Sequence, residues 1–564
     1  MRLLLSTASF VLLLAASAAA QTSSTANQAK RATVEGTVVN AQTKEPLRRA
    51  EVSLLSNGAG RGGGGGFGRP GGPGGGGGGR KVTTDAAGKF SFTDVEAGQY
   101  TVAAQRNGFL NGRYGAKRPN QPATPVKVSD GDSLRSLTIE LLPQAVIAGR
   151  IFDDEGEPLQ GAFVMLVSGG PGQRGGRGGP QRSTATNDRG EFRLINVSPG
   201  DVILQVSPTQ QFGPGGPNLP ENADSSMVTT YFPGVTELSR AQKIPVTAGA
   251  ELTGFDIRLQ KTRVYTIRGR LIDSATGQPP NGAGVLLMPR DAAFTGMAIG
   301  SNGGRQTEGR FELRGVPAGS YNLMVRGGGG PGGGRGGSAH RERLDVTGNI
   351  DNLTIRVLPP LNLTGQVIAR DPEKSDVKNV RVTLTDVEGV MNAGSRGATK
   401  PDGSFAIDGV AAGRYRITAT PGSGGYIESI RYGEMEVLGQ EVEIAAGSSA
   451  PIRVTMNHEV ASLNVTVTRD ESATQGATVV LFPADKSRWS DQGAVRTAAA
   501  DRSAAVALSN LAPGNYLLLA VEEFDFGFWE DPEVMRKIEG RLEKVTLDKN
   551  AAQSVSLKLT PLGN

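Results

Sequence analysis

The chain has 564 residues, with 81 glycines, 32 prolines, no cysteine and a formal net charge of +5. Without cysteine, disulfides, thiolate metal centres and lipid anchors on cysteine are excluded. So small a charge over so long a chain gives no reason to expect a nucleic-acid-binding protein, and the length allows three to five domains.

The first twenty residues have the pattern of an export signal. Arg2 supplies a positive start, residues 3–14 form an apolar run, and three alanines precede Gln21. The run is too short to span a membrane comfortably, since a spanning helix needs about 20 residues. We therefore expect residues 1–20 to be a cleaved signal peptide, followed by a linker at 21–31. The mature protein is predicted to have no transmembrane segment and to be exported. We expect it to be periplasmic, outer-membrane-associated or extracellular.

One pattern recurs five times along the rest of the chain. An acidic residue and a glycine, such as Asp85 and Gly88 or Asp188 and Gly190, precede a phenylalanine, and a second glycine precedes a tyrosine ten residues after that phenylalanine. Asp and Gly favour tight turns, so each copy predicts turn, strand, turn, strand. In the second copy Val202 stands in the tyrosine position, and in the fifth copy Val506 replaces the phenylalanine. The repeat positions are Phe90, Gly98, Tyr100; Phe192, Gly200; Phe311, Gly319, Tyr321; Phe405, Gly413, Tyr415; and Gly514, Tyr516.

Further short strands flank this pattern in each copy. Upstream, apolar residues alternate with polar ones around a glycine such as Gly36, which becomes Val465 in the fifth copy, and two short alternating segments close each copy. Six or seven strands in roughly 100 residues are typical of a small antiparallel sandwich. The predicted fold is all-β, with tandem antiparallel β-sandwich modules, transthyretin-like or immunoglobulin-like, in an elongated array. The one helix signal lies at residues 531–539, where an N-cap aspartate precedes a proline.

These motifs resemble the carboxypeptidase regulatory-like domain, through Gly-x-Val, Pro-Leu-x-x-Ala-x-Val, Asp-x-x-Gly-x-Phe and Gly-x-Tyr. The resemblance implies a transthyretin-like sandwich, often grouped with carbohydrate-binding-like folds, that serves as a non-catalytic accessory module on exported bacterial proteins and surface receptors. It covers nearly all of the mature chain. The predicted domains are 32–143 with a Gly-rich loop at 58–80, 144–261 with a Gly-rich loop at 169–180, 262–358 with a Gly-rich loop at 327–337, 359–457, and a degenerate fifth at 458–564.

Residues for catalysis are scarce. The two histidines, His340 and His458, lie far apart and neither has the spacing of a metal-binding pair. We therefore predict no enzyme, no metal and no cofactor. The acidic segment 153–157 has oxygen ligands suited to calcium, but a solvated hairpin turn explains it better. The arginines of the Gly-rich loops leave open a weak attraction to acidic polysaccharide or lipid headgroups.

Aromatic residues outside the repeat give the most specific hypothesis about a ligand, which is a sugar. Tyr114, Tyr231, Tyr432 and Trp529 occupy loops after the repeat tyrosine strand in several copies. An exposed ring stacks well on a sugar face, whereas a buried one covers the end of a core or packs on the next module. The two alternatives differ only in exposure.

The predicted function is a non-catalytic structural or interaction array in the cell envelope. Two alternatives are a glycan-binding array that uses the loop aromatics, and an accessory subunit of an outer-membrane transporter or secreted hydrolase. The partners expected are polysaccharide or envelope proteins, and no nucleic acid.

Overall fold

A computed structural model provides the fold. It describes residues 31–56, 79–119, 121–168, 182–208, 224–280, 283–290, 299–300, 309–326, 338–371, 373, 377–387, 395–422, 424–448, 450–470, 472–474, 476–489, 493–524 and 527–561. The predicted signal peptide 1–20, nearly all of the linker 21–31, and the Gly-rich segments 58–78, 169–180 and 327–337 lie outside these residues. Within the described part, regular structure is almost entirely β-strand, so the all-β prediction is confirmed.

In the described part of the chain, five sandwich cores follow one another, and we number the modules by them. The cores span Ala32–Leu141 in module 1, Ala145–Leu259 in module 2, Ile267–Val357 in module 3, Leu361–Met456 in module 4 and Ala461–Leu557 in module 5.

Each module packs two sheets against each other. In module 1 one sheet has the order β4-β1-β8, with β1 (Ala32–Asn40), β4 (Lys89–Val95) and β8 (Ser133–Leu141). The other contains β3 (Arg80–Thr83), β2 (Glu51–Ser56), β5 (Gly98–Gln105), β6 (Gly112–Arg113) and β7 (Val126–Val128). Residues alternate between buried and exposed along β1 and β4, because successive side chains point to opposite faces of a sheet.

The other modules repeat this plan. Their first sheets hold, in module 2, β9 (Ala145–Phe152), β12 (Glu191–Val197), β17 (Glu251–Leu252) and β18 (Ile257–Arg258); in module 3, β19 (Lys261–Asp273), β22 (Arg310–Pro317) and β25 (Ile350–Val357); in module 4, β26 (Leu361–Ala369), β29 (Ser404–Val410), β31 (Tyr426–Tyr432), β32 (Met435–Glu436) and β34 (Ile452–Asn457); and in module 5, β35 (Ala461–Arg469), β36 (Ser472–Ala473), β39 (Ala505–Leu511) and β42 (Ala552–Lys558).

Their second sheets hold, in module 2, β10 (Phe163–Ser168), β11 (Arg182–Ala185), β13 (Gly200–Ser207), β15 (Thr230–Tyr231) and β16 (Ile244–Val246); in module 3, β20 (Gly284–Pro289), β21 (Ile299–Gly300), β23 (Gly319–Arg326) and β24 (Ser338–Val346); in module 4, β27 (Arg381–Asp386), β28 (Ser395–Ala398), β30 (Gly413–Thr420) and β33 (Glu441–Ile444); and in module 5, β37 (Thr478–Pro483), β38 (Arg496–Ala499), β40 (Gly514–Val521) and β41 (Glu543–Leu547).

Helical structure is short. It consists of α1 (Pro532–Ile538), η1 (Leu238–Arg240), η3 (Lys486–Arg488), η4 (Phe528–Glu530) and η5 (Glu539–Arg541) among the described residues. The predicted N-cap of α1 is confirmed, since the Asp531 carboxylate accepts hydrogen bonds from the amides of Glu533 and Val534.

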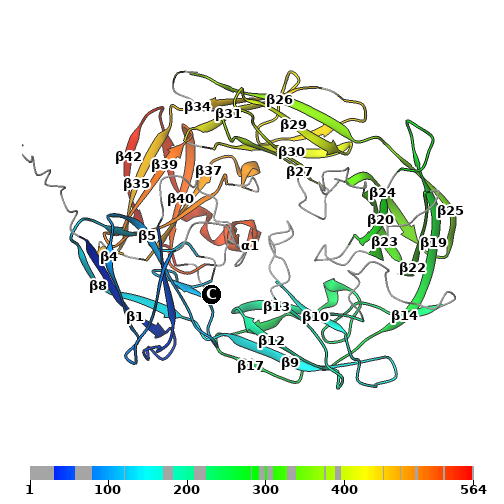
Figure 1. The fold of residues 1–564 in the computed structure, drawn as a ribbon, viewed down its shortest axis with the longest axis horizontal. Helices are drawn as coiled ribbons and strands as arrows, with labels where there is room; N and C mark the ends of the chain where they lie inside the picture. Colours follow the sequence, from blue (N-terminus) through cyan, green and yellow to red (C-terminus); the bar gives the residue numbers. More distant parts are fainter. Residues whose placement is uncertain are drawn as a thin grey trace, which may run out of the picture.

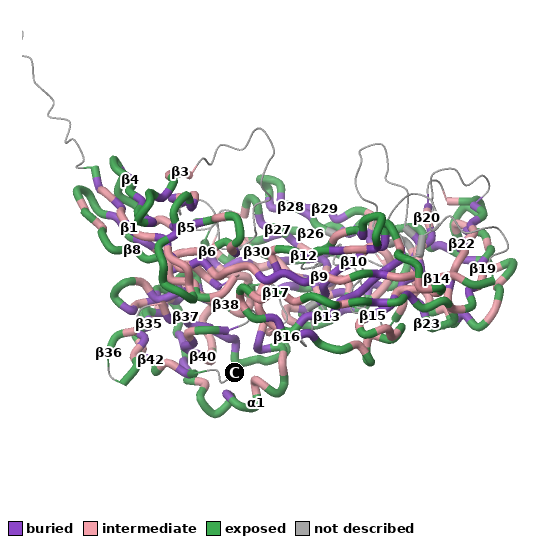
Figure 2. The backbone as a smooth tube through the Cα atoms, turned by 90° about the horizontal axis from the view of Figure 1, so that it is seen from below, coloured by how far each residue is buried: buried purple, intermediate pink, exposed green. Residues whose placement is uncertain are grey.

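The five modules lie in a ring, and this path differs from the elongated one expected. Figure 1 shows module 5 returning to module 1, with the sheet that holds each module's first strand on the outside of the ring (the outer sheet) and the second sheet on the inside (the inner sheet). In Figure 2 module 1 lies above module 5, so the ring resembles one turn of a shallow helix. Two or three residues join each outer sheet to the next, as between Leu141 and Ala145.

One strand pair departs from the antiparallel pattern in every module. The first strand pairs in parallel with the closing strand, as in β1 with β8, β19 with β25, β26 with β34 and β35 with β42, while β9 pairs in parallel with β17 and β18. The remaining pairs are antiparallel. The sandwich therefore contains one mixed sheet and one antiparallel sheet.

The repeat glycine upstream lies directly across from the repeat phenylalanine. Gly36 pairs with Phe90, and a Cβ added at Gly36 would lie 2.6 Å from the phenylalanine Cζ and 2.1 Å from the Leu137 carbonyl oxygen. The same cross-strand pair recurs in modules 2, 3 and 4. Module 5 pairs Val465 with Val506 at this register. Two medium side chains thus fill the space that a ring and a glycine fill elsewhere.

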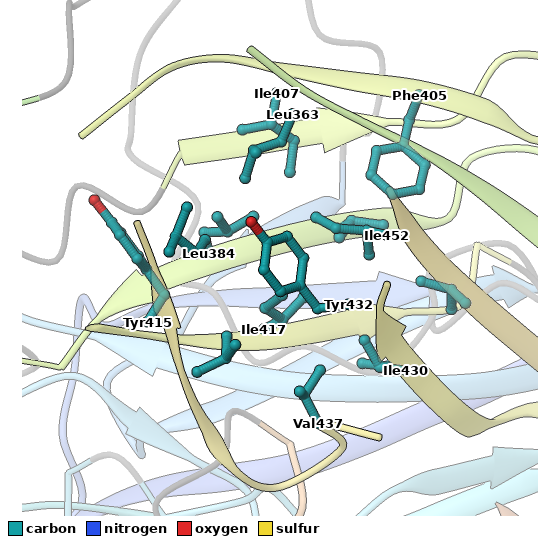
Figure 3. Close-up of a cluster of buried hydrophobic side chains, with 14 of the residues drawn as sticks. Leu363, Leu384, Phe405, Ile407, Tyr415, Ile417, Ile430, Tyr432, Val437 and Ile452 are labelled. Atoms are coloured by element: carbon teal, nitrogen blue, oxygen red, sulfur yellow. The ribbon is translucent and has the colours of Figure 1, made fainter. Parts of the chain in front are cut away.

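The repeat tyrosine closes the sheet-to-sheet turn. In modules 1, 3, 4 and 5 its hydroxyl donates a hydrogen bond to the carbonyl four residues earlier, for example Tyr321 to Pro317 at 2.9 Å and Tyr516 to Ala512 at 2.7 Å. Figure 3 shows the corresponding Tyr415 at the rim of the module 4 core, with its hydroxyl pointing away from Ile417. This arrangement, a tyrosine corner, fixes the turn through the hydroxyl while the ring packs against the apolar core.

One residue of the predicted turn is shifted by a position. In module 2 the side chain that holds the turn is Asn187, not Asp188, because the Asn187 amide oxygen accepts hydrogen bonds from the amides of Arg189 and Glu191 at 3.0 and 2.8 Å. Asp85 makes the same bonds in module 1. Asn and Asp are interchangeable in this turn, because each carries an acceptor oxygen on Cγ.

The Gly–Phe pair of modules 1–4 and the Val–Val pair of module 5 predict that two substitutions in module 5 compensate for each other. Val506→Phe alone should destabilise module 5 by about 1–3 kcal/mol, because the ring would overlap Val465. Adding Val465→Gly should recover a coupling energy of about 0.5–3 kcal/mol. Urea unfolding with hydrogen exchange at β35 and β39 measures each variant. Strictly additive single effects would contradict this account of the fifth module.

The module 4 tyrosine predicts a loss of stability at high pH. Burial raises the pKa of Tyr415 to about 12, and the charge of Asp386 adds to this. The unfolded chain loses this proton first, near pH ~10, so the stabilisation is complete below that pH and is lost as pH rises to ~12. Unfolding midpoints of wild type and Tyr415→Phe should converge over this range. Below pH ~10 the difference between wild type and Tyr415→Phe should instead stay constant, which is the internal control.

Candidate functional site

The acidic segment proves to be a turn. The carboxylate of Asp153 accepts hydrogen bonds from the amides of Glu155, Gly156 and Glu157, each at 2.9 Å. These backbone bonds, that from Glu157 above all, lower the pKa of Asp153. Asp154 forms an ion pair with Lys261 at 3.0 Å. The carboxylates of Asp153 and Asp154 are thus engaged in the turn and in the junction with module 3.

The two histidines lie far apart in the fold, one in module 3 and the other between modules 4 and 5. His340 is 3.3 Å from the Glu342 carboxylate on β24, and His458 follows β34. Across the described residues, no group of three or more His, Asp or Glu side chains is arranged to hold a metal ion.

Three of the four predicted stacking rings are buried. Tyr231, Tyr432 and Trp529 are 6%, 9% and 7% exposed. Tyr231 lies on β15 beside β13, the Tyr432 hydroxyl hydrogen-bonds to Ser448, and Trp529 packs edge-on against Phe482. Stacking on a sugar needs an exposed ring face, so this burial removes the physical basis of the stacking prediction for these three residues.

The fourth ring is half-buried at the edge of module 1. Tyr114 packs against the module 1 core, and burial raises the pKa of its hydroxyl. The charge of Arg502 in module 5 acts on it in the opposite direction. Tyr114 therefore belongs to the surface where the two ends of the array meet.

This meeting surface, the ring-closing contact, is formed by Lys117, Arg118 and Gln121 of module 1 and by Glu522, Glu523 and Phe524 of module 5. Gln121 is 3% exposed, and its side-chain nitrogen donates to the carbonyl oxygens of Phe524 at 3.3 Å and of Glu522 at 3.5 Å. Its amide oxygen accepts hydrogen bonds from the backbone amides of Lys117 and Arg118. A buried amide with its donors and acceptors matched on both sides orients the two modules.

Ion pairs flank the buried glutamine. Lys117 pairs with Glu522, which also pairs with Arg469, and Arg118 lies 3.7 Å from Glu523. Burial by itself would raise the pKa of Glu522, but hydrogen bonds from Lys117 and Arg469 outweigh it and lower the pKa. Glu522 therefore stays ionised and holds cations of both modules.

Sequence reasoning missed this contact entirely. Lys117 and Glu522 are 405 residues apart, and neither belongs to the repeat. The only sequence signal is that a basic pair, Lys117 and Arg118, lies in the first copy and an acidic pair, Glu522 and Glu523, in the last. Complementary charge does not by itself identify partners so far apart.

Comparison with known proteins bears on the module type. Residues 33–142 match the carboxypeptidase regulatory-like domain family, which confirms the predicted resemblance for these residues. No curated protein sequence matches the chain significantly.

Several solved structures are distantly similar to the chain. They include the TIE protein of Bacillus anthracis, at 13% identity over 75% of this chain and 72% of that chain with a TM-score of 0.16. The minor pilin of Streptococcus agalactiae has 11% identity over 41% and 96%, with a TM-score of 0.22. Two B repeat units of the collagen-binding protein of Staphylococcus aureus have 11% identity over 76% and 100%, with a TM-score of 0.13. We base no functional conclusion on similarities this distant.

The geometry of the ring-closing contact predicts that a double variant opens the ring. Gln121→Ala with Glu522→Gln leaves buried carbonyls unpaired and removes two ion pairs. Each lost buried hydrogen bond costs about 1–3 kcal/mol, which shifts the ratio of closed to open rings by about tenfold or more. Small-angle X-ray scattering should show a larger radius of gyration.

The matched control is Glu140→Gln. It removes an exposed ion pair with Lys44 inside module 1 and should leave the scattering unchanged. Unchanged scattering of the double variant would show that other contacts hold the ring together.

Proposed function

We propose that this protein is an exported, non-catalytic scaffold of the cell envelope that binds polysaccharide or envelope proteins on a closed ring of five modules. The observation that carries the proposal is the ring-closing contact, in which buried Gln121 of module 1 donates a hydrogen bond to the Phe524 carbonyl of module 5, 403 residues further along the chain. A chain of independent modules has no need for such a contact. A scaffold does, because fixing the modules beforehand lowers the entropy lost when a partner binds several of them.

The other junctions support a fixed arrangement. Between modules 2 and 3, strand β14 (Ser225–Met227) precedes the module 3 core in sequence and pairs with the start of β19. Between modules 1 and 2, the Gly249 amide donates to the Pro143 carbonyl at 3.0 Å and Gln42 donates to the Ala248 carbonyl at 2.9 Å. Backbone hydrogen bonds across a junction resist rotation more than a flexible linker does.

The location rests on the sequence. Residues 1–20 have the three parts of a cleaved signal. Module 1 matches the carboxypeptidase regulatory-like domain family, a resemblance that implies an exported protein. No helix in the described part of the chain is long and apolar enough to cross a membrane. We place the mature protein in the periplasm, at the outer membrane or outside the cell.

The proposal predicts that partner binding depends on ring closure. Affinity-tagged protein should be found in the envelope fraction with Gln21 at its N-terminus, together with a stoichiometric envelope protein or polysaccharide. The Gln121→Ala/Glu522→Gln variant should be exported and folded but should retain much less of that partner, because its modules are no longer held together.

A covalent closure provides the rescue. The chain has no cysteine, so Lys117→Cys with Glu522→Cys, joined by a short bismaleimide, should close the ring and keep the partner. The control pair Lys117→Cys with Glu312→Cys lies in separate parts of the ring and should not crosslink. Equal partner retention by open and closed rings, or retention of the protein in the cytoplasm, would overturn the proposal.

A further inference from the structure

Module 3 carries a group of arginines on the face of its inner sheet that points away from the core. The strands β20, β23 and β24 are neighbours in this sheet, and the register places Met324 opposite Arg341 and Asn322 opposite Arg343. Core residues such as Leu323 and Val325 alternate with them and point to the other face. Arg290 follows β20 in the next row, where its amide donates to the Ser320 carbonyl at 3.0 Å.

One arginine of this group is fixed by the neighbouring module. The Arg341 guanidinium forms a two-point ion pair with the Asp386 carboxylate at the end of β27 in module 4. Both side chains are largely covered, at 20% and 23% exposure. An arginine–carboxylate pair of this geometry is rigid. The junction of modules 3 and 4 therefore holds this end of the arginine group in place.

The other two arginines have no counterion in the part of the chain that the structure describes. Arg290 and Arg343 are exposed, and neither forms an ion pair or a side-chain hydrogen bond with any residue that the structure describes. Together with Arg341, Asn322 and Glu342 they line a cavity of about 360 Å³. This volume lies within the range of about 300–1,000 Å³ that is usual for small-molecule sites. Two free guanidinium groups in one cavity attract an anion.

We propose that this cavity binds the carboxylate of an acidic oligosaccharide, with Arg290 and Arg343 as its counterions. Guanidinium groups bind carboxylates through paired hydrogen bonds. The Asn322 amide supplies an acceptor and donors for the hydroxyls of the sugar ring. No apolar side chain of the described residues lines the cavity, so an aliphatic or aromatic ligand gains little there.

An acidic side chain beside the cavity favours a sugar acid over a phosphate. Asp345 follows Arg343 by two residues on the same face of β24 and accepts a hydrogen bond from the Ser320 hydroxyl. A phosphate carries up to two negative charges, and the Asp345 carboxylate repels them more strongly than it repels the single charge of a sugar carboxylate. The site lies on the inner side of the ring, where Figure 1 shows β20, β23 and β24. It depends on the module 3–4 junction and not on the ring-closing contact.

The test measures binding to the full chain by isothermal titration calorimetry. The probes are a trimer of galacturonic acid, the uncharged galactose trimer, inorganic phosphate, and a triglutamate peptide with the same number of side-chain carboxylates as the sugar acid. The acidic trimer should bind, and Arg290→Gln with Arg343→Gln should weaken it about tenfold or more per arginine, since each loses a charge-assisted hydrogen bond. The uncharged trimer should bind at least tenfold more weakly than the acid.

The matched control is Arg270→Gln with Arg356→Gln, which removes two exposed arginines from the outer sheet of the same module. It should leave the affinity unchanged, although it lowers the net charge equally. No binding of the acidic trimer, or equal weakening by both double variants, overturns the site. Equal or tighter binding of phosphate or of triglutamate through Arg290 and Arg343 overturns the sugar-acid assignment. The Gln121→Ala/Glu522→Gln ring should bind the trimer as wild type does, so failure here and failure of the scaffold proposal are distinguishable.

Discussion

The parallel pairing of the first and last strand of each module decides how the chain continues. Because β1 and β8 run in the same direction side by side, the chain leaves module 1 at the opposite end of the outer sheet from where it came in. An antiparallel last strand would return the chain to its starting point. Two or three residues then lead into the next outer sheet, as from Val357 to Leu361. The modules are therefore joined head to tail along their outer sheets, with their inner sheets on one side.

Repetition of one kind of joint in one sense produces the ring, and closure then needs few contacts. Exposed ion pairs contribute about 0–1 kcal/mol each, so Lys117 and Arg118 alone would not hold two free modules together. Within one chain, however, the joints already bring module 5 near module 1, and the effective concentration of the two surfaces is high. Under that condition, a buried glutamine with matched hydrogen bonds suffices.

The sequence predicts the interior of each module better than the arrangement of modules. Phe90, Gly98 and Tyr100 could be assigned because cores and turns demand particular residues at particular spacings. Two departures of the fifth copy, Val465 and Val506, are coordinated changes that only the cross-strand register explains. Burial of the loop aromatics depends on tertiary packing, which has no periodic signal. The ring-closing contact and the arginine group depend on residues from distant segments meeting in space, and no spacing rule links those.

The inner faces of the modules are where the repeats differ most. In module 5 this face is apolar and is covered by the module's own helical segment, so that Val480, Phe482 and Leu519 are buried beneath Trp529 and Ile538. In module 3 the same face carries the free arginines. Module 1 presents Glu51, paired there with Lys81 and Gln105. A side chain that points away from the core can be replaced by one of a different size, whereas a side chain that points into the core must keep about the same volume. The ring keeps one core design five times and directs its varied faces toward a common interior, where Figure 1 places α1 of module 5.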